Sequence, residues 1–98
     1  MEKRTPHCPL ERVKVLAAAR RIRPTGAALR GAKALGMDYP GMLEVISSLE
    51  RTDFYKSMTS HMDHRVWQDV YRPLTAVGCV YLKVSVVDDV LIVSFKGL

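Results

Sequence analysis

Tyr81 and Lys96 are the two residues whose types and spacing point most directly to chemistry. Each lies in one of two alternating apolar segments, residues 79–87 and 90–96, which are joined by an Asp-Asp connection. Such a connection predicts a β-hairpin, and its register makes Tyr81 and Lys96 cross-strand neighbours. A phenol beside an ammonium group can bind a phosphate. More often such a pair is an ordinary strand contact between a cation and an aromatic ring, so the spacing leaves both interpretations open.

His61 and His64 raise the question of a metal site or an acid/base pair. The spacing His-x-x-His occurs in zinc sites, but no convincing second pair of Cys or His ligands accompanies it here. Asp63 could act with His64, yet no nearby residue completes a nucleophilic triad. We therefore expect a loop at this position and no metal or cofactor.

The hairpin register also predicts two faces with different roles. Pairing of Val87 with Val90 continues to Leu82 opposite Phe95. One face is then apolar and suited to being covered by helices, and it contains Leu82, Val84, Val86, Leu91, Val93 and Phe95. The opposite face carries Tyr81 and Lys96 at the end of the ladder away from the turn.

The first half of the chain predicts helices. Apolar residues recur at helical spacing in three segments, residues 10–17, 25–35 and 38–49. Thr25 is a suitable N-cap for the second helix and Gly36 a suitable stop. The third helix is expected to follow Asp38, with Pro40 near its first turn. Ile22, flanked by arginines, predicts a short edge strand. The expected core-facing stripes are Ala28, Leu29, Ala32 and Leu35 in the second helix, and Met42, Val45, Ile46 and Leu49 in the third.

The second half is typical of β-structure. Aromatic and β-branched residues are frequent in two segments before the hairpin, residues 54–59 and 66–72. Residues 73–78 predict a loop. The sequence therefore predicts one α+β domain over residues 1–98, mainly helical over 1–51 and mainly strands over 52–98. We expect the N-terminal helices to pack on one face of a mostly antiparallel sheet.

Length and composition exclude several classes of protein. Ninety-eight residues allow one core. The apolar runs are far shorter than the roughly 20 residues that cross a bilayer, and the N-terminus has no apolar segment typical of a secretion signal. Cys8 and Cys79 make no disulfide framework, so both are expected to be free thiols. We expect a cytoplasmic protein without membrane contacts.

The net charge of +5 is concentrated in the first half. Residues 1–51 carry ten Lys or Arg against five Asp or Glu, whereas residues 52–98 carry five of each. A basic surface suits a polyanion or an acidic protein partner. A solvated helical surface explains the same charge equally well.

Several linked segments closely resemble the MqsR toxin family. The resemblance covers essentially the whole chain and is looser over residues 8–36. It is carried by MEKRTPH (1–7), TDFYKSMT (52–59), WQDVYRP (67–73), VYLKV (80–84) and DVLIVSFK (89–96).

This resemblance implies a RelE/ParE-like domain that acts as the toxin of a type II toxin–antitoxin system. Toxins of this family cleave single-stranded mRNA at short sites and need neither a ribosome nor a metal. Each is neutralised by an MqsA-type antitoxin, which has a zinc-binding part and a DNA-binding part, so DNA is expected to be contacted only through the antitoxin complex. The family's active-site residues correspond to Lys56, Gln68, Tyr81 and Lys96 in this chain.

We predict cleavage by attack of the RNA 2′-hydroxyl on the adjacent phosphorus. Lys56 would serve as base or charge stabiliser, with its pKa lowered by neighbouring cations. Lys96 would stabilise the phosphorane, Tyr81 would donate a proton or orient the site, and Gln68 would position the RNA. Two further residues, Arg72 as a phosphate contact and His64 as a reserve base, complete the predicted RNA-binding set. A gyrase-inhibiting toxin and a non-catalytic RNA-binding module remain the alternatives.

Overall fold

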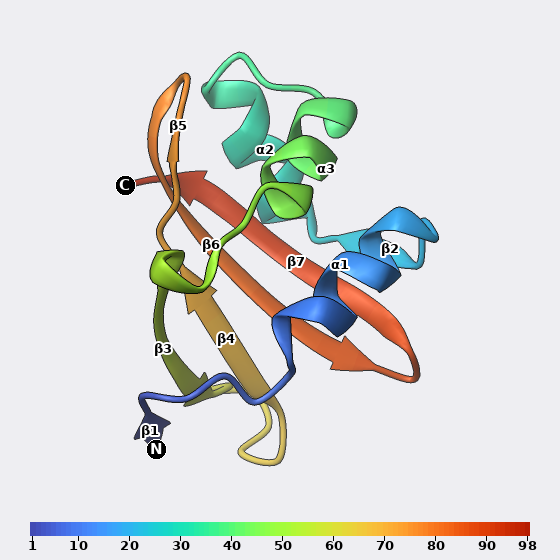
Figure 1. The fold of residues 1–98 in the computed structure, drawn as a ribbon, viewed down its shortest axis with the longest axis vertical. Helices are drawn as coiled ribbons and strands as arrows, with labels where there is room; N and C mark the ends of the chain where they lie inside the picture. The colour runs from blue at the N-terminus through green and yellow to red at the C-terminus, as the bar shows by residue number, and fades with distance from the viewer.

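The sheet is built around one long hairpin and is mostly antiparallel (Figure 1). The computed structural model describes residues 1–98. In chain order its elements are β1 (Glu2–Lys3), α1 (Leu10–Ala18), β2 (Ile22–Pro24), α2 (Gly26–Ala34), α3 (Tyr39–Ser47), a short 3₁₀ helix (Arg51–Asp53), β3 (Phe54–Thr59), β4 (Trp67–Tyr71), β5 (Leu74–Thr75), β6 (Gly78–Val87) and β7 (Val90–Gly97). Six strands follow the order β1-β3-β4-β6-β7-β2, and β5 pairs with β6 beside this path. The pairing of β2 with β7 is parallel and all the others are antiparallel.

The β6–β7 hairpin has the predicted register. Val87 pairs with Val90, and the ladder continues without interruption to Val80 opposite Gly97. Asp88 and Asp89 form the turn with φ angles of 52° and 59°. Two residues with positive φ are what a type I′ turn requires, and this turn matches the natural twist of the two strands. The short turn therefore fixes which side chains face the core.

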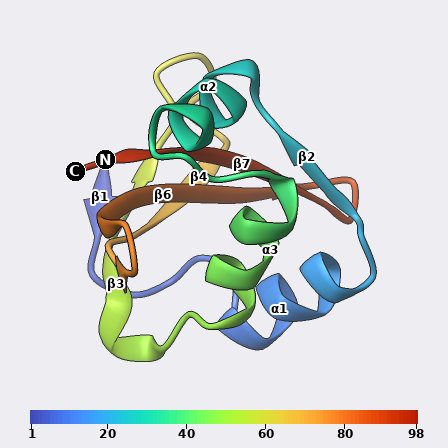
Figure 2. The same cartoon turned by 90° about the horizontal axis from the view of Figure 1, so that it is seen from above.

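Helices α1 and α3 lie on the predicted apolar face of the sheet, as Figure 2 shows from above. Their buried side chains pack against the inward-facing residues of β6 and β7 in one cluster of 16 residues, which includes Val13, Leu16, Met42, Ile46, Leu82, Val84, Leu91, Val93 and Phe95. Asp38 caps α3 by accepting a hydrogen bond from the backbone N–H of Gly41. Burial of these two apolar stripes is the main stabilising contribution to the fold.

Helix α2 does not lie on that face, which corrects the prediction that all the helices share it. It follows β2 directly and lies against the outer edge of β7, where a Cβ on Gly31 would come within 2.0 Å of the carbonyl oxygen of Phe95. Only a glycine permits this close approach. Ala28 is buried as predicted, whereas Leu29 is 50% exposed, because α2 contacts a narrow strand edge instead of a broad apolar face.

The first half also contains two short strands, so it is less uniformly helical than predicted. Strand β1 precedes the helices, and β2 separates α1 from α2 at the sheet edge predicted for Ile22. In the second half, the predicted loop at 73–78 contains β5 and the first residue of β6. No helix is long and apolar enough to cross a membrane.

Asp69 on β4 anchors the segment between β1 and α1. Its buried carboxylate accepts hydrogen bonds from the backbone N–H groups of His7 and Cys8, each at 2.9 Å. Burial raises the pKa of the Cys8 thiol, and the Asp69 carboxylate adds to this effect. Cys8 and Cys79 are both free thiols, as predicted. This anchor positions β1 beside β3, where it contributes to the candidate site.

Candidate active site

The face of the sheet opposite α1 and α3 carries the predicted site residues, and it is called the open face below. Side chains alternate along a strand. Since Leu82 and Phe95 are buried under the helices, their chain neighbours Tyr81 and Lys96 point to the open face. The ammonium nitrogen Nζ of Lys96 lies 5.3 Å from the centre of the Tyr81 ring. The predicted Tyr81–Lys96 neighbourhood is therefore confirmed.

Lys56 reaches the same face because β3 contains a β-bulge. The register of β3 on β4 shifts between Phe54 and Lys56 and leaves Tyr55 as an extra residue. Phe54 packs against the core and Ser57 is fully buried, so both point to the helix side. Tyr55 and Lys56 consequently lie together on the open face. Strict alternation from Phe54 would have turned Lys56 toward the helices.

Glu2 of β1 holds the ammonium group of Lys56. The Nζ of Lys56 donates a hydrogen bond to Oε1 of Glu2 at 2.5 Å, and the Lys56 side chain is only 18% exposed. This hydrogen bond raises the pKa of Lys56, with smaller contributions of the same sign from the charge of Glu2 and from Tyr55 and Tyr81. The same contact lowers the pKa of Glu2. The sequence-based expectation that neighbouring cations lower the pKa of Lys56 is therefore wrong.

Tyr55 forms a second contact group with two arginines. The guanidinium carbon of Arg72 lies 3.8 Å from the centre of the Tyr55 ring, and that of Arg4 lies 5.8 Å from it. The Nζ of Lys56 is 5.4 Å from the same ring. Arg72, predicted as a phosphate contact, therefore lies beside Lys56 on the open face.

Gln68 lies on the open face at the other side of Lys56. It pairs with Met58 of β3, two residues along the ladder from the pair of Lys56 with Val70. Diagonal neighbours of this kind have Cα atoms about 7–8 Å apart. The half-buried Gln68 amide is thus close to Lys56 and farther from Tyr81 and Lys96.

His64 does not join this group. It is exposed in the loop between β3 and β4, at the end of β4 opposite to Arg72. The five residues of β4 separate the two positions by roughly 16 Å. Asp63 forms hydrogen bonds with the backbone and side chain of Arg65, so the acid/base pair considered for Asp63 and His64 is not formed.

The open face is strongly cationic. Five cations lie on it or at its edge beside a single carboxylate, that of Glu2, and they are Arg4, Lys56, Arg72, Lys83 and Lys96. Of these five only Lys56 is in an ion pair, since the cations of the other three ion pairs in the molecule are Arg12, Arg51 and Arg65. Four unpaired cations on one face attract a phosphodiester backbone and can stabilise negative charge that develops on it.

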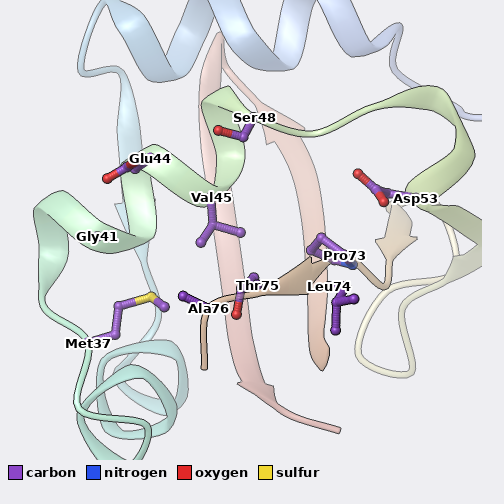
Figure 3. Close-up of a pocket in the computed structure, with 10 residues that line it drawn as sticks. All are labelled: Met37, Gly41, Glu44, Val45, Ser48, Asp53, Pro73, Leu74, Thr75 and Ala76. Atoms are coloured by element: carbon purple, nitrogen blue, oxygen red, sulfur yellow. The ribbon is translucent and has the colours of Figure 1, made fainter. Parts of the chain in front are cut away.

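The cavities of the molecule lie elsewhere, and one of about 380 Å³ is lined by residues that include Pro6, Leu10 and Tyr71. A second cavity, of about 360 Å³, opens between α3 and β5, and Figure 3 shows Val45 of α3 on one side of it and Thr75 of β5 on the other. Its carboxylates, Glu44 and Asp53, give it no resemblance to a phosphate site. No group of three or more His, Cys, Asp or Glu side chains is arranged to hold a metal ion. Lys56, Gln68, Tyr81 and Lys96 line none of the cavities, so the predicted site residues lie on an open sheet surface.

Comparison with known proteins identifies the family of the chain. The family model described as "Motility quorum-sensing regulator, toxin of MqsA" matches residues 5–97. The chain belongs to the MqsR toxin family. It is 57% identical over 96 residues to the mRNA interferase toxin MqsR of Escherichia coli (strain K12), and the match covers 98% of each chain. The matched range spans the positions of Lys56, Gln68, Tyr81 and Lys96, whose roles remain predictions.

Three residues of the open face were not anticipated from the sequence. Tyr55 owes its position to a bulge, which leaves no clear signal in the residues of one strand. Glu2 lies in β1 and Arg4 directly follows it, and Glu2 is 54 positions before its partner Lys56. The repeated presence of lysine, arginine and tyrosine in the segments that resemble the MqsR family was the one available hint.

Proposed function

We propose that this protein is the toxin of a type II toxin–antitoxin system and cleaves messenger RNA without a metal ion or a ribosome. The observation that carries the proposal is the open face, where Lys56, Tyr81 and Lys96 lie among further unpaired cations. The name of the E. coli relative, mRNA interferase toxin, agrees with this chemistry. The three helices and the mostly antiparallel sheet are consistent with the RelE/ParE-like architecture that the resemblance implied.

In the proposed reaction, the RNA provides its own nucleophile. The 2′-oxygen forms a bond to the adjacent phosphorus and the bond to the 5′-oxygen breaks, which yields a 2′,3′-cyclic phosphate and a 5′-hydroxyl. Lys56 and Lys96 act as ammonium ions that stabilise the extra negative charge of the phosphorane. Tyr81 donates its phenolic proton to the leaving 5′-oxygen.

Lys56 is a charge stabiliser in this scheme and not the base. Its contact with Glu2 raises its pKa, so the side chain retains its proton at neutral pH. The proton of the 2′-hydroxyl is therefore released to solvent. Gln68, next to Lys56, positions the nucleotide. Arg72 and the exposed His64, which lie beyond opposite ends of β4, contact the RNA on either side of it.

An MqsA-type antitoxin is the proposed protein partner, in agreement with the family description. DNA would be contacted only through the complex with that antitoxin. The proposed site of action is the cytoplasm, where the mRNA substrate is found.

The test is cleavage of a defined RNA in excess EDTA by the parent protein and by Lys96→Ala and Lys33→Ala. Lys33 is an exposed lysine on α2, away from the open face, and serves as the matched control. We expect discrete cuts with 5′-hydroxyl ends from the parent and the control, and a loss of about a hundredfold or more for Lys96→Ala. Intact RNA with the parent would refute the proposal, and equal cutting by all three proteins would remove Lys96 from the site.

A further inference from the structure

Arg4, Tyr55 and Arg72 form a group that the reaction itself does not require. They come from three separate segments: the residue after β1, the bulge of β3 and the residue after β4. The guanidinium of Arg72 lies 3.8 Å from the centre of the Tyr55 ring, and Arg4 approaches the same ring at 5.8 Å. Two arginines therefore lie close to the same aromatic ring at one edge of the open face.

Both arginines are available to a ligand. Arg4 and Arg72 are exposed, and neither takes part in an ion pair with a carboxylate. A guanidinium close to an aromatic ring keeps its charge and its planar set of N–H donors, and the contact with the ring restricts its motion. The ring therefore organises a cation that would otherwise be mobile, which reduces the entropy lost when a ligand binds.

The group adjoins the residues proposed to act on the cleaved bond. Tyr71, the last residue of β4, pairs with Leu82, so the following residue, Arg72, is level with Tyr81 of β6. On its other side, the Tyr55 ring is 5.4 Å from the ammonium group of Lys56. A phosphate bound by Arg4 and Arg72 would lie beside the cleaved phosphodiester without displacing Tyr81 or Lys96.

We propose that Arg4, Tyr55 and Arg72 form a second phosphate subsite, which binds a backbone phosphate next to the one that is cleaved. The inference rests on the proposed ribonuclease function and adds the direction in which the RNA leaves the reacting residues. Arg72 and Arg4 bind the phosphate oxygens by charge-assisted hydrogen bonds. Tyr55 acts through Arg72 as a positioning residue.

The test combines variants with RNAs of different length. A defined RNA is shortened one nucleotide at a time from each end, keeping the cleaved bond. For Arg72→Gln and Arg4→Gln, KM should rise about tenfold on the long RNA with kcat changed less than about twofold. The effect should disappear on the RNA that lacks the flanking phosphate, for which the parent itself has a raised KM. Lys33→Gln on α2 removes one exposed cation elsewhere and should leave both parameters unchanged.

Tyr55 variants separate positioning from simple loss of structure. Tyr55→Phe retains the ring and should match the parent, whereas Tyr55→Leu should raise KM only for RNAs that contain the flanking phosphate. Thermal unfolding of both variants shows whether the fold is intact. A change in KM that is equal for all RNA lengths, or a fall in kcat of the same size for all of them, would overturn the subsite.

A binding measurement without cleavage tests the phosphate subsite independently of the proposed ribonuclease activity. An RNA with a 2′-deoxy nucleotide at the cleaved position cannot react, so its affinity can be measured by fluorescence anisotropy over a range of salt concentrations. Loss of one phosphate contact should lower the slope of log affinity against log salt by about 0.7 in Arg72→Gln. This result would support the subsite even if the parent cut no RNA, and an unchanged slope would exclude it even if the parent did.

Inorganic phosphate at millimolar concentration should not compete with the RNA for binding, because the subsite binds the phosphate of a chain that other residues already hold. Full competition by free phosphate would identify an adventitious anion site.

Discussion

Replacing Glu2 by Gln should strengthen RNA binding, because Glu2 pairs with the ammonium group of Lys56 and so competes with a phosphate for it. In the free protein, Oε1 of Glu2 lies 2.5 Å from the Nζ of Lys56, and an incoming phosphate must break this contact. The Glu2 side chain is 55% exposed, so the pair is partly screened by water and its contribution is that of a weak surface ion pair. Removing the competing charge should therefore tighten binding of uncleavable RNA by roughly two- to fivefold. Glu2→Asp, which keeps the charge on a shorter side chain, is the matched control.

The pH dependence of the same variant provides a second and independent measurement. The profile of kcat/KM against pH reports the ionisation of the free protein. Glu2 raises the pKa of Lys56, so the loss of activity at alkaline pH should begin at a lower pH in Glu2→Gln than in the parent. The contribution of the contact to stability should be complete between the ordinary pKa of Glu, 4.5, and that of Lys, 10.5, where both groups are charged in the folded and the unfolded chain. As the pH falls below 4.5 toward the lowered pKa of folded Glu2, parent and variant should therefore converge in stability.

One result would refute the reasoning. If Glu2→Gln lowered kcat by tenfold or more and left RNA affinity unchanged or weaker, Glu2 would be acting in the reaction itself, as the base or as the group that orients Lys56. In that case the release of the 2′-proton to solvent would also be wrong. An unchanged alkaline limb would show that Lys56 is not the group whose ionisation ends activity.

Two further substitutions test the fold that supports the site. Gly31→Ala places a Cβ 2.0 Å from the carbonyl oxygen of Phe95, so it should destabilise the protein by about 3 kcal/mol. Gly26→Ala on the same helix meets only the flexible end of Arg30 and should be nearly neutral by thermal unfolding. Tyr71→Phe removes a buried hydroxyl without a partner and should stabilise by about 1 kcal/mol. Burial raises the pKa of Tyr71 to about 12, so the free energy of unfolding of the parent, unlike that of the variant, should fall as the pH rises from 10 to 12.

The half of the site on the hairpin could be predicted because its geometry is local. A two-residue turn fixes the register of β6 on β7, and the alternation of apolar residues then decides the face of every side chain. Tyr81 and Lys96 are placed by these two rules alone. The same rules gave the buried positions under α1 and α3, such as Leu82 and Phe95.

The other half could not be predicted because it depends on contacts between distant segments. The loop between β3 and β4 is long enough to allow several registers, so the sequence does not fix which residues of these strands face one another. The packing of α2 on the edge of β7 was missed for a similar reason. Its small residues are compatible with a helix on a sheet face, and only the close approach of Gly31 to Phe95 distinguishes the edge.

The bulge in β3 shows why naming Lys56 as a site residue did not reveal its orientation or its chemical role. The resemblance to the MqsR family named Lys56, but the extra residue at Tyr55 turns its side chain toward the open face, and β1 supplies the carboxylate that holds its proton. The nearest charge to Lys56 is thus an anion and not the cations expected from composition. A lysine in this environment stabilises charge and does not accept a proton at neutral pH. The chemistry assigned to Lys56 therefore follows from a backbone irregularity and a strand of two residues, and the proposed role of Tyr55 follows from the same irregularity.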